Sequence, residues 1–329
     1  MSEGSGRTVG VTGATGFVGR YTVRELLGRG HRVRALVRDV EKAGKVLPTE
    51  DERLDLVTGD LHDRAALERL ADGADALVNT IGIIREAPGG QTFQRIHVEG
   101  AKRLVGAAVR EDVKRIVQVS AIGVRDEGVC EYQRSKFEAE TIIRQSGLAW
   151  TILRSSLVHG PDGEFIQMVR GWVTGKATPH IFIPYFQRLE SGPPIPGLGK
   201  MSDAKIAPVA VEDLAWAIGE SLDRKAAEGE VYNITGPEEL TMPELIKLFQ
   251  ERVPLAKKGL RMIPVPDKAG AMVARVARLT GLQHALPYDE GMALMAGEDT
   301  TAEPVKAREH LGFRPRPFRA TAEAYAPKL

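Results

Sequence analysis

Tyr132 and Lys136 are the residues whose types and spacing could most directly do chemistry. They stand in the run YQRSK ahead of an amphipathic stretch, and a helix would place them on one face because residues four apart are neighbours there. A phenol with a pKa of about 10 is a poor base at neutral pH, but a nearby ammonium favours the phenolate. The pair therefore predicts proton transfer, with Lys136 lowering the pKa of Tyr132. Taken alone, the spacing is usually that of a surface pair, and it is the position after the fifth strand of a dinucleotide-binding fold that favours the catalytic interpretation.

A glycine-rich turn, TGATGFVG at 12–19, follows the first apolar run of the chain. Gly13 permits a tight turn, Gly16 lets backbone N–H groups approach a diphosphate, and Gly19 allows close packing of a helix on a strand. The N-terminus of that helix adds positive potential. We expect the turn to hold a dinucleotide, and a turn without a ligand is the alternative. The residues expected to bind are Gly13, Thr15, Gly16, Phe17, Val18 and Gly19.

The end of the second apolar run discriminates between dinucleotides. An acidic side chain there binds the adenosine 2′-hydroxyl, whereas a basic one favours a 2′-phosphate. The run ends in Arg38 and then Asp39, which face oppositely on a strand. We favour NADP(H) bound by Arg38, with NAD(H) bound by Asp39 as the alternative. Asp60 and Leu61 end the third run, where Asp60 either accepts from the adenine amino group or caps a helix.

The elements that must position these residues alternate along the first half of the chain. Short β-rich runs are separated by apolar stripes at helical spacing, the pattern of βαβ units. Such units form an α/β fold with a doubly wound parallel sheet, whose ligand crevice lies beyond the carboxyl ends of its strands. The predicted strands are 8–12, 32–37, 54–58, 76–80, 115–120 and 149–153.

The helical periodicity ends after residue 172. Residues 175–204 carry five prolines and several glycines, which predict a long loop, and their apolar side chains favour a lid over the crevice. Helices and short strands follow, which we expect to form a smaller C-terminal cap. The expected helices are 213–222, 242–253 and 267–279, and the expected short strands are 230–234 and 262–265.

Several motifs together resemble the short-chain dehydrogenases/reductases in their extended and atypical branches. The resemblance runs from residue 8 to about residue 234, carried by the glycine turn, GDL at 59–61, VS at 119–120, YQRSK at 132–136 and VEDLA at 211–215. The stretch NTIGIIRE at 79–86 looks most like one atypical group. That group contains the dehydrogenase-like accessory subunit of respiratory complex I and bacterial proteins labelled nucleoside-diphosphate-sugar epimerases.

The resemblance implies a Rossmann fold and hydride chemistry on a carbonyl or hydroxyl substrate. Tyr132 and Lys136 would be catalytic, and Lys136 and Ser120 would also contact the cofactor. Two positions depart from the family pattern, because Ala121 replaces a catalytic Ser or Thr and His97 replaces Asn. A structural or sensor protein that holds NADPH without turnover, as the complex I subunit does, is therefore the alternative to an oxidoreductase or epimerase.

The same reasoning divides the chain into two regions. We expect an NADP-binding Rossmann domain over residues 1–172, and the lid and cap over 173–329. Residues of about 205–236 are expected to return to the first domain. The substrate is expected to be a small molecule, either hydrophobic or a nucleotide sugar. Arg188, Lys200 and Lys205 are loose candidates for binding a sugar diphosphate.

The remaining candidate residues have ordinary interpretations beside functional ones. His97 is either a core histidine bonded to backbone or a proton relay, and His159 is either a loop residue or part of the substrate crevice. Cys130 is interpreted as incidental. The group of Asp60, His62 and Asp63 offers too few ligands, so no metal is expected.

Composition excludes several classes of partner. Lys and Arg number 45 against 44 Asp and Glu, so no net field favours nucleic acid. A single cysteine excludes an internal disulfide, and the polar N-terminus lacks the apolar core of a signal peptide. No run approaches the roughly 18 apolar residues of a transmembrane segment. We expect a cytoplasmic protein, and the sequence does not determine its oligomeric state.

Overall fold

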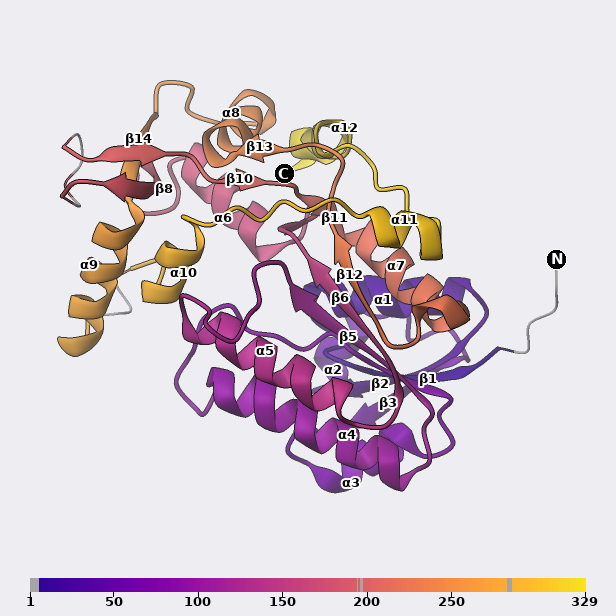
Figure 1. The fold of residues 1–329 in the computed structure, drawn as a ribbon. Coiled ribbons are helices and arrows are strands. Elements are labelled where there is room, and N and C mark those ends of the chain that lie inside the picture. The colour runs from indigo at the N-terminus through magenta and orange to yellow at the C-terminus, as the bar shows by residue number, and fades with distance from the viewer. Residues whose placement is uncertain (1–5, 194, 196–197, 283–285) are drawn as a thin grey trace.

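A sheet of seven parallel strands forms the centre of the computed structural model, which describes residues 6–193, 195, 198–282 and 286–329 (Figure 1). All six predicted strands are present, and their bounds differ from the prediction by two residues or fewer. The seventh strand, over residues 230–234, extends this sheet beside β6. In spatial order the strands are β12 (Glu230–Ile234), β6 (Ala149–Ser155), β5 (Arg115–Ala121), β4 (Ala76–Asn79), β1 (Thr8–Thr12), β2 (Arg32–Val37) and β3 (Leu54–Thr58).

Helices cover both faces of the sheet, which explains why its strands are continuous apolar runs. One face packs against α1 (Phe17–Gly28), α2 (Val40–Gly44), α7 (Val211–Asp223) and α11 (Val305–Leu311). The other packs against α3 (Arg64–Ala71), α4 (Gly100–Arg110) and α5 (Glu131–Arg144). A π-helical turn, η1 (Gln94–Glu99), leads directly into α4.

The strand order reverses between β1 and β4, and a crevice for ligands is expected beyond the carboxyl ends of those strands. Buried polar side chains link the strands at this end. Thr12 Oγ1 donates to Asn79 Oδ1 at 2.6 Å, and Asn79 Nδ2 donates to Gln118 Oε1 at 2.8 Å. Because these groups satisfy one another, they fix the three strand ends at the crevice.

The cap has its own apolar core, to which one strand and three helices contribute beside the shorter elements named below. These are β8 (Phe182–Ser191), α6 (Glu164–Val173), α8 (Met242–Arg252) and α12 (Phe318–Tyr325). Strand β8 lies between β14 (Arg261–Pro266) and β9 (Lys200–Ser202), and α9 (Asp267–Leu279) and α10 (Glu290–Met295) pack beside this sheet. Smaller elements are the pairs β7 (Val158–His159) with β11 (Val209–Ala210) and β10 (Lys205–Ile206) with β13 (Leu240–Thr241), and the turns η2 (Lys225–Ala227) and η4 (Ala326–Lys328).

The prediction of a long loop over residues 175–204 is wrong, because β8 occupies ten of those residues. Pro184 made the segment unlike a central strand, but β9 pairs with β8 only from Arg188 onward. Pro184 therefore has a neighbouring strand on one side only, which is the edge position where a sheet tolerates proline. Ile183 is fully buried and the Phe186 ring packs on Tyr288, so the apolar side chains belong to the cap rather than to a lid.

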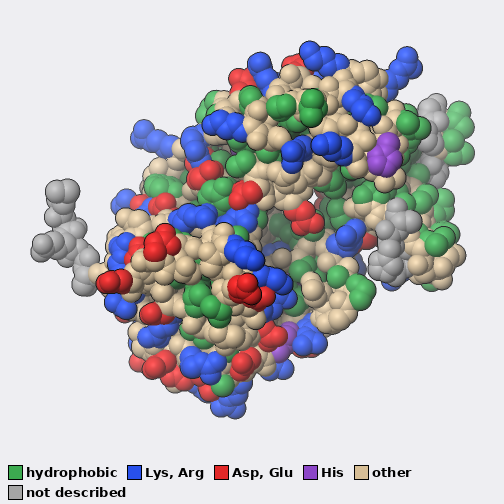
Figure 2. Space-filling view, turned by 180° about the vertical axis from the view of Figure 1, so that it is seen from behind, with side chains coloured by type: hydrophobic (Ala, Val, Ile, Leu, Met, Phe, Trp, Pro, Cys, Tyr) green, Lys and Arg blue, Asp and Glu red, His purple; other side chains and the backbone are tan. Residues whose placement is uncertain are grey.

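Acidic and basic side chains are interspersed over the face that Figure 2 shows, and a hollow lies between the two halves of the molecule. None of the described helices combines the length and the apolar composition that crossing a bilayer requires. Within the described residues, no group of three or more His, Cys, Asp or Glu side chains is placed to hold a metal ion.

Candidate functional site

The glycine turn between β1 and α1 is closed by its own backbone. Gly13 has a φ of +72°, a left-handed conformation that favours glycine, and its carbonyl accepts a hydrogen bond from Gly16 N at 2.8 Å. A Cβ atom on Gly19 would lie 2.0 Å from the Gly13 carbonyl oxygen. Helix α1 can therefore pack this closely on β1 only with glycine at position 19.

The first turn of α1 is open to a ligand. Gly16 caps the helix without any side-chain hydrogen bond, and a Cβ atom there would meet only the Gly13 oxygen, at 3.1 Å. The Phe17 ring turns away and packs on the backbone of Gly160 and Gly163. Uncapped N–H groups at a helix N-terminus are a site for a phosphate group, so the turn fits the diphosphate of a dinucleotide. Val18 packs against the core and Thr15 is half-buried, which leaves their backbone atoms for such contacts.

Arg38 is exposed at the end of β2 and borders a cavity of about 290 Å³. The carboxylate of Asp39 caps α2, since its Oδ1 accepts from Lys42 N at 3.0 Å. Asp60 also borders the cavity, but its Oδ1 accepts from the backbone N–H of His62 and Asp63 in a turn before α3. Leu61 is buried. Of the two candidate residues that follow β2, Arg38 is thus the one that lines the cavity.

Tyr132 and Lys136 share one face of α5, with the Lys136 Nζ 5.7 Å from the centroid of the Tyr132 ring. Lys136 is buried, and its Nζ lies 3.4 Å from the carbonyl oxygen of Val119 on β5. Burial lowers the pKa of Lys136 to about 8, against the opposing charge of Glu140. Burial also raises the pKa of the Tyr132 phenol, which therefore stays protonated at neutral pH in the absence of a ligand.

His97 is a core histidine bonded to backbone, the ordinary one of its two interpretations. Its Nε2 accepts from Ile83 N at 3.2 Å, and its Nδ1 lies 2.9 Å from Ser135 Oγ. Burial lowers the pKa of His97 to about 2, with the Lys136 charge acting in the same direction, so the ring is neutral and donates from Nδ1. The ring lies edge-on to Tyr132 at 5.7 Å and holds the phenol in place by packing.

Ser120 faces a buried carboxylate that sequence reasoning did not identify. Its Oγ donates to Glu140 Oε1 at 2.7 Å, and Glu140 is fully buried. Arg144 and Arg154 each pair with Glu140, at 2.8 and 2.6 Å. The Ser120 hydroxyl is therefore bonded to Glu140 on α5, so only the backbone atoms of Ser120 are available to a cofactor. No sequence pattern signals this contact, because Ser120 and Glu140 meet only where α5 packs on β5.

Replacing Glu140 with alanine is expected to lower the free energy of unfolding by about 3 kcal/mol, because two arginines lose a buried partner. Glu138 on the same helix is the matched control. It is about half exposed and pairs with Lys102 at 3.5 Å, so Glu138→Ala should cost less than about 1 kcal/mol. Urea unfolding of both variants measures the difference, and equal costs would contradict this account of Glu140.

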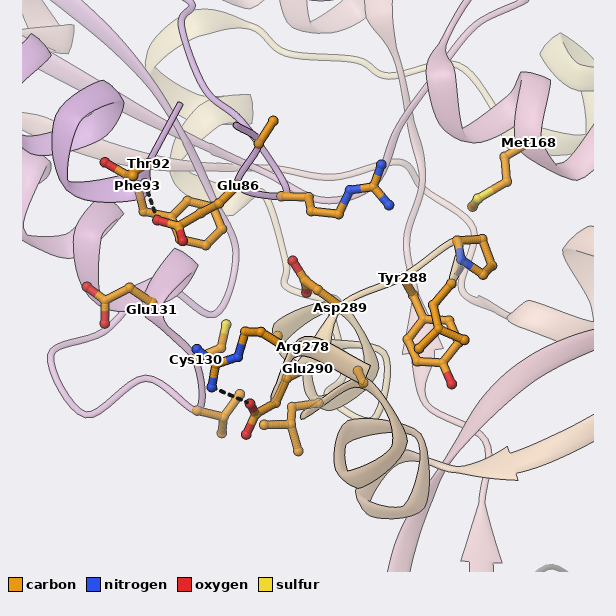
Figure 3. A pocket seen from close by; sticks show the side chains of 18 of the residues that line it. Glu86, Thr92, Phe93, Cys130, Glu131, Met168, Arg278, Tyr288, Asp289 and Glu290 are labelled. Carbon is orange, nitrogen blue, oxygen red and sulfur yellow. Dashed lines mark hydrogen bonds and ion pairs between the residues drawn. The ribbon is translucent and has the colours of Figure 1, made fainter. Parts of the chain in front are cut away.

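A cavity of about 930 Å³ lies between the loops that follow β4 and β5 and the helices α6, α9 and α10 (Figure 3). Its lining combines apolar side chains with charges of both signs. Arg278 pairs with Glu290 at 3.7 Å across one wall, and Glu86 accepts from Phe93 N at 2.8 Å on the other. Tyr132 and Lys136 are not among the lining residues, but the Phe93 ring lines the cavity and lies edge-on to Tyr132 at 5.9 Å.

The expected sugar-diphosphate residues do not line this cavity. Arg188, Lys200 and Lys205 are committed to ion pairs with Asp299, Glu190 and Glu239. The arginines that do line the cavity are Arg85, Arg134 and Arg278, which come from three separate segments. Sequence patterns gave no signal for them, because only the packing of α9 and α10 against the sheet domain brings these segments together.

His159 and Cys130 take structural positions. His159 is buried under α12, with its Nδ1 3.2 Å from the Tyr325 hydroxyl and its ring edge-on to Phe318. It therefore belongs to the cap interface and does not line the large cavity. The buried Cys130 contributes to the cavity wall, and burial raises the pKa of its thiol, which keeps it in the unreactive form.

Comparison with known proteins shows what the chain resembles. Residues 13–175 match a protein family described as NAD(P)H-binding. Ceramide reductase of Caulobacter vibrioides is 32% identical over 65% of this chain and 61% of its own length. The 40 kDa subunit of NADH-ubiquinone oxidoreductase of Neurospora crassa is 26% identical over 82% of this chain. The chain spans 66% of that subunit.

A third relative matches along nearly the whole chain. The (4-alkanoyl-5-oxo-2,5-dihydrofuran-3-yl)methyl phosphate reductase of Streptomyces griseus is 27% identical over 97% of this chain and 99% of its own. Among solved structures, the dTDP-glucose 4,6-dehydratase of Streptomyces venezuelae, with bound NAD, superimposes with a TM-score of 0.70. The match covers 97% of this chain and 95% of the other at 23% identity, and it shows the shared fold.

Proposed function

We propose that this chain is a member of the short-chain dehydrogenases/reductases in their atypical branch and that it acts as an NADP(H)-dependent reductase of a carbonyl substrate. The observation that carries the proposal is the arrangement of Tyr132 and Lys136 on α5, with the Tyr132 ring packed on Phe93 in the wall of the large cavity. Two of the relatives are named reductases, which supports this direction of reaction.

The residues that would hold the cofactor lie at the carboxyl ends of β1, β2 and β3. The open first turn of α1 would bind the diphosphate, and Arg38 would bind the 2′-phosphate beside Asp60. Lys136, whose Nζ lies at β5, would donate to the ribose nearer the nicotinamide. When bound, the nicotinamide supplies the hydride.

Tyr132 would donate the proton that the substrate oxygen needs as a carbonyl becomes a hydroxyl. Burial keeps the phenol protonated and ready to donate. The Lys136 ammonium would then stabilise the phenolate that remains. No hydroxyl stands at Ala121, so polarisation of the substrate oxygen would fall to Tyr132 alone.

The substrate would occupy the large cavity beside Phe93. Apolar walls formed by Phe93, Met168, Trp172 and Tyr288 suit a carbonyl compound with an apolar body. The experiment is to incubate the purified protein with NADPH and a panel of apolar ketones, aldehydes, quinones and nucleotide-4-keto sugars while following the absorbance of the reduced nicotinamide. Turnover of an apolar carbonyl supports the proposal. Turnover confined to the keto sugars would contradict the assigned substrate class.

Arg38 is proposed to select NADPH over NADH. Arg38→Ala is expected to weaken NADPH binding by about 10- to 100-fold, the value of a charged hydrogen bond to phosphate, and to leave NADH binding nearly unchanged. Arg32, at the opposite end of β2 and paired with Asp55, is the control position. Calorimetric titration of both cofactors against Arg38→Ala and Arg32→Ala tests this. Equal losses of NADH and NADPH affinity in Arg38→Ala would contradict it.

The rate of reduction should depend on the protonation of Lys136. Reduction needs Tyr132 protonated and Lys136 charged, so kcat/KM should be level below pH 8 and fall as the pH rises through the Lys136 pKa of about 8. The expected slope is about tenfold per pH unit. Glu140→Gln should move the break to lower pH, because the Glu140 charge raises the pKa of Lys136. A rate that is constant or rising up to about pH 10 would contradict this role.

A second candidate function is supported by the two departures from the family pattern. Ala121 supplies no hydroxyl and His97 is neutral and buried, so NADPH could serve as a permanent structural ligand. A subunit of NADH-ubiquinone oxidoreductase is among the relatives, and this similarity supports the alternative. Tight NADPH binding with no turnover across the panel would favour the second candidate over the reductase.

A further inference from the structure

Helix α9 exposes an apolar stripe at the outer edge of the cap. Met272, Val273, Val276 and Leu279 follow helical spacing and are 58%, 50%, 55% and 76% exposed. Leu282, just beyond the helix, is 62% exposed. Helix α9 and strand β14 lie at the left of Figure 1, which is the right of Figure 2 because that view is from behind. Hydrophobic side chains gather at this right-hand edge of Figure 2. A contiguous exposed apolar surface of this kind marks an interaction site.

The charges beside the stripe are basic. Lys268 and Arg275 are exposed along one border of the stripe, and Arg278 follows one turn later. Asp267 is the single acidic residue of α9, and it is buried, with its Oδ1 accepting from Leu189 N and Lys268 N. The exposed surface of α9 is therefore apolar and positive. A helix with an apolar face and a basic border suits the surface of an anionic bilayer.

The opposite face of α9 lines the large cavity. Ala274 and Arg278 contribute to its wall, while Val273 and Val276 point outward. Gly270 fixes the helix on the cap sheet, because a Cβ atom there would lie 2.3 Å from the Phe186 ring. One rigid helix thus separates the cavity from the apolar stripe. A molecule dissolved in a bilayer at the stripe would be one helix diameter from the cavity.

We propose that the exposed face of α9, from Lys268 to Leu279 with Leu282, docks on the surface of a lipid bilayer that contains anionic headgroups. The apolar stripe inserts between the headgroups, and Lys268 and Arg275 contact phosphate groups. The protein lies on the bilayer and does not span it. This docking does not depend on the proposed reductase activity, because it involves neither Tyr132 nor the glycine turn.

Sedimentation with lipid vesicles tests the proposal. The full chain is mixed with vesicles of phosphatidylcholine that contain about one third phosphatidylglycerol, and with vesicles of phosphatidylcholine alone. We expect binding to the anionic vesicles that weakens with added salt, and weaker binding to the neutral ones. Val276→Glu should lower the partition coefficient by about tenfold, because a charge replaces an inserted side chain.

Val109 provides the matched control, since it is also a valine on a helix and is also 55% exposed. Val109→Glu should leave vesicle binding unchanged, and NADPH titration and thermal melting should show that both variants are folded. Failure of the wild-type chain to bind anionic vesicles, equal binding of Val276→Glu and wild type, or equal binding to both kinds of vesicle would each overturn the proposal. So would a dimer in solution that Val276→Glu dissociates, because a second copy would then cover the stripe.

Discussion

Gly19→Ala is expected to weaken NADPH binding by at least about 100-fold and to lower the melting temperature. The added Cβ atom would lie 2.0 Å from the Gly13 carbonyl oxygen and 2.9 Å from the Ala14 Cα, so the turn or α1 must move. Any such movement displaces the N–H groups of the first helical turn, which are the proposed diphosphate ligands. Calorimetric titration with NADPH measures the loss of affinity.

Gly28 at the other end of α1 is the control for this substitution. No protein atom lies within 4 Å of a Cβ placed there, and the residue is helical. Gly28→Ala should therefore bind NADPH as the wild type does and should gain about 0.5 to 1 kcal/mol of stability from helix propensity. Wild-type affinity in Gly19→Ala would show that the turn does not hold the dinucleotide.

Tyr132→Phe is expected to lower kcat for carbonyl reduction by about 10²- to 10⁴-fold, because the hydroxyl is the proposed proton donor. The phenyl ring keeps its packing against His97 and Phe93, so NADPH affinity should change by less than about twofold. Steady-state kinetics on a substrate from the carbonyl panel, together with NADPH titration, separates the two quantities.

Tyr232→Phe is the corresponding control outside the crevice. The Tyr232 hydroxyl donates to Ala226 O at 3.1 Å, away from the large cavity, so its loss should affect stability and not kcat. A Tyr132→Phe variant that retains full turnover would remove the tyrosine from the reaction, even if NADPH binding were established.

Local patterns predicted the sheet domain well, because its strands and its glycine turn depend mostly on residues that are close in sequence. The apolar runs and the Gly13 to Gly19 spacing determine β1, the turn and α1 without help from the rest of the chain. The cap is different. Pro184 is tolerated in β8 because of where β9 ends, and that depends on pairing between segments far apart in sequence.

The candidate site likewise has one part that the sequence predicts and other parts that depend on tertiary packing. Tyr132 and Lys136 could be placed on one face because four residues separate them on one helix. The partner of Ser120 could not be predicted, because Glu140 reaches β5 only through the packing of α5 on the sheet. The cavity beside Phe93 could not be predicted from the sequence either, because its walls come from loops of the sheet domain and from α9 and α10 together.

A crystal structure of the full chain grown with NADPH tests most directly whether the backbone N–H groups at the start of α1 hold the diphosphate of NADP(H). We expect the diphosphate within hydrogen-bond distance of the backbone N–H groups of Gly16, Phe17 or Val18, and the 2′-phosphate beside Arg38. Electron density that placed NADPH elsewhere, with the glycine turn free of phosphate, would contradict the account.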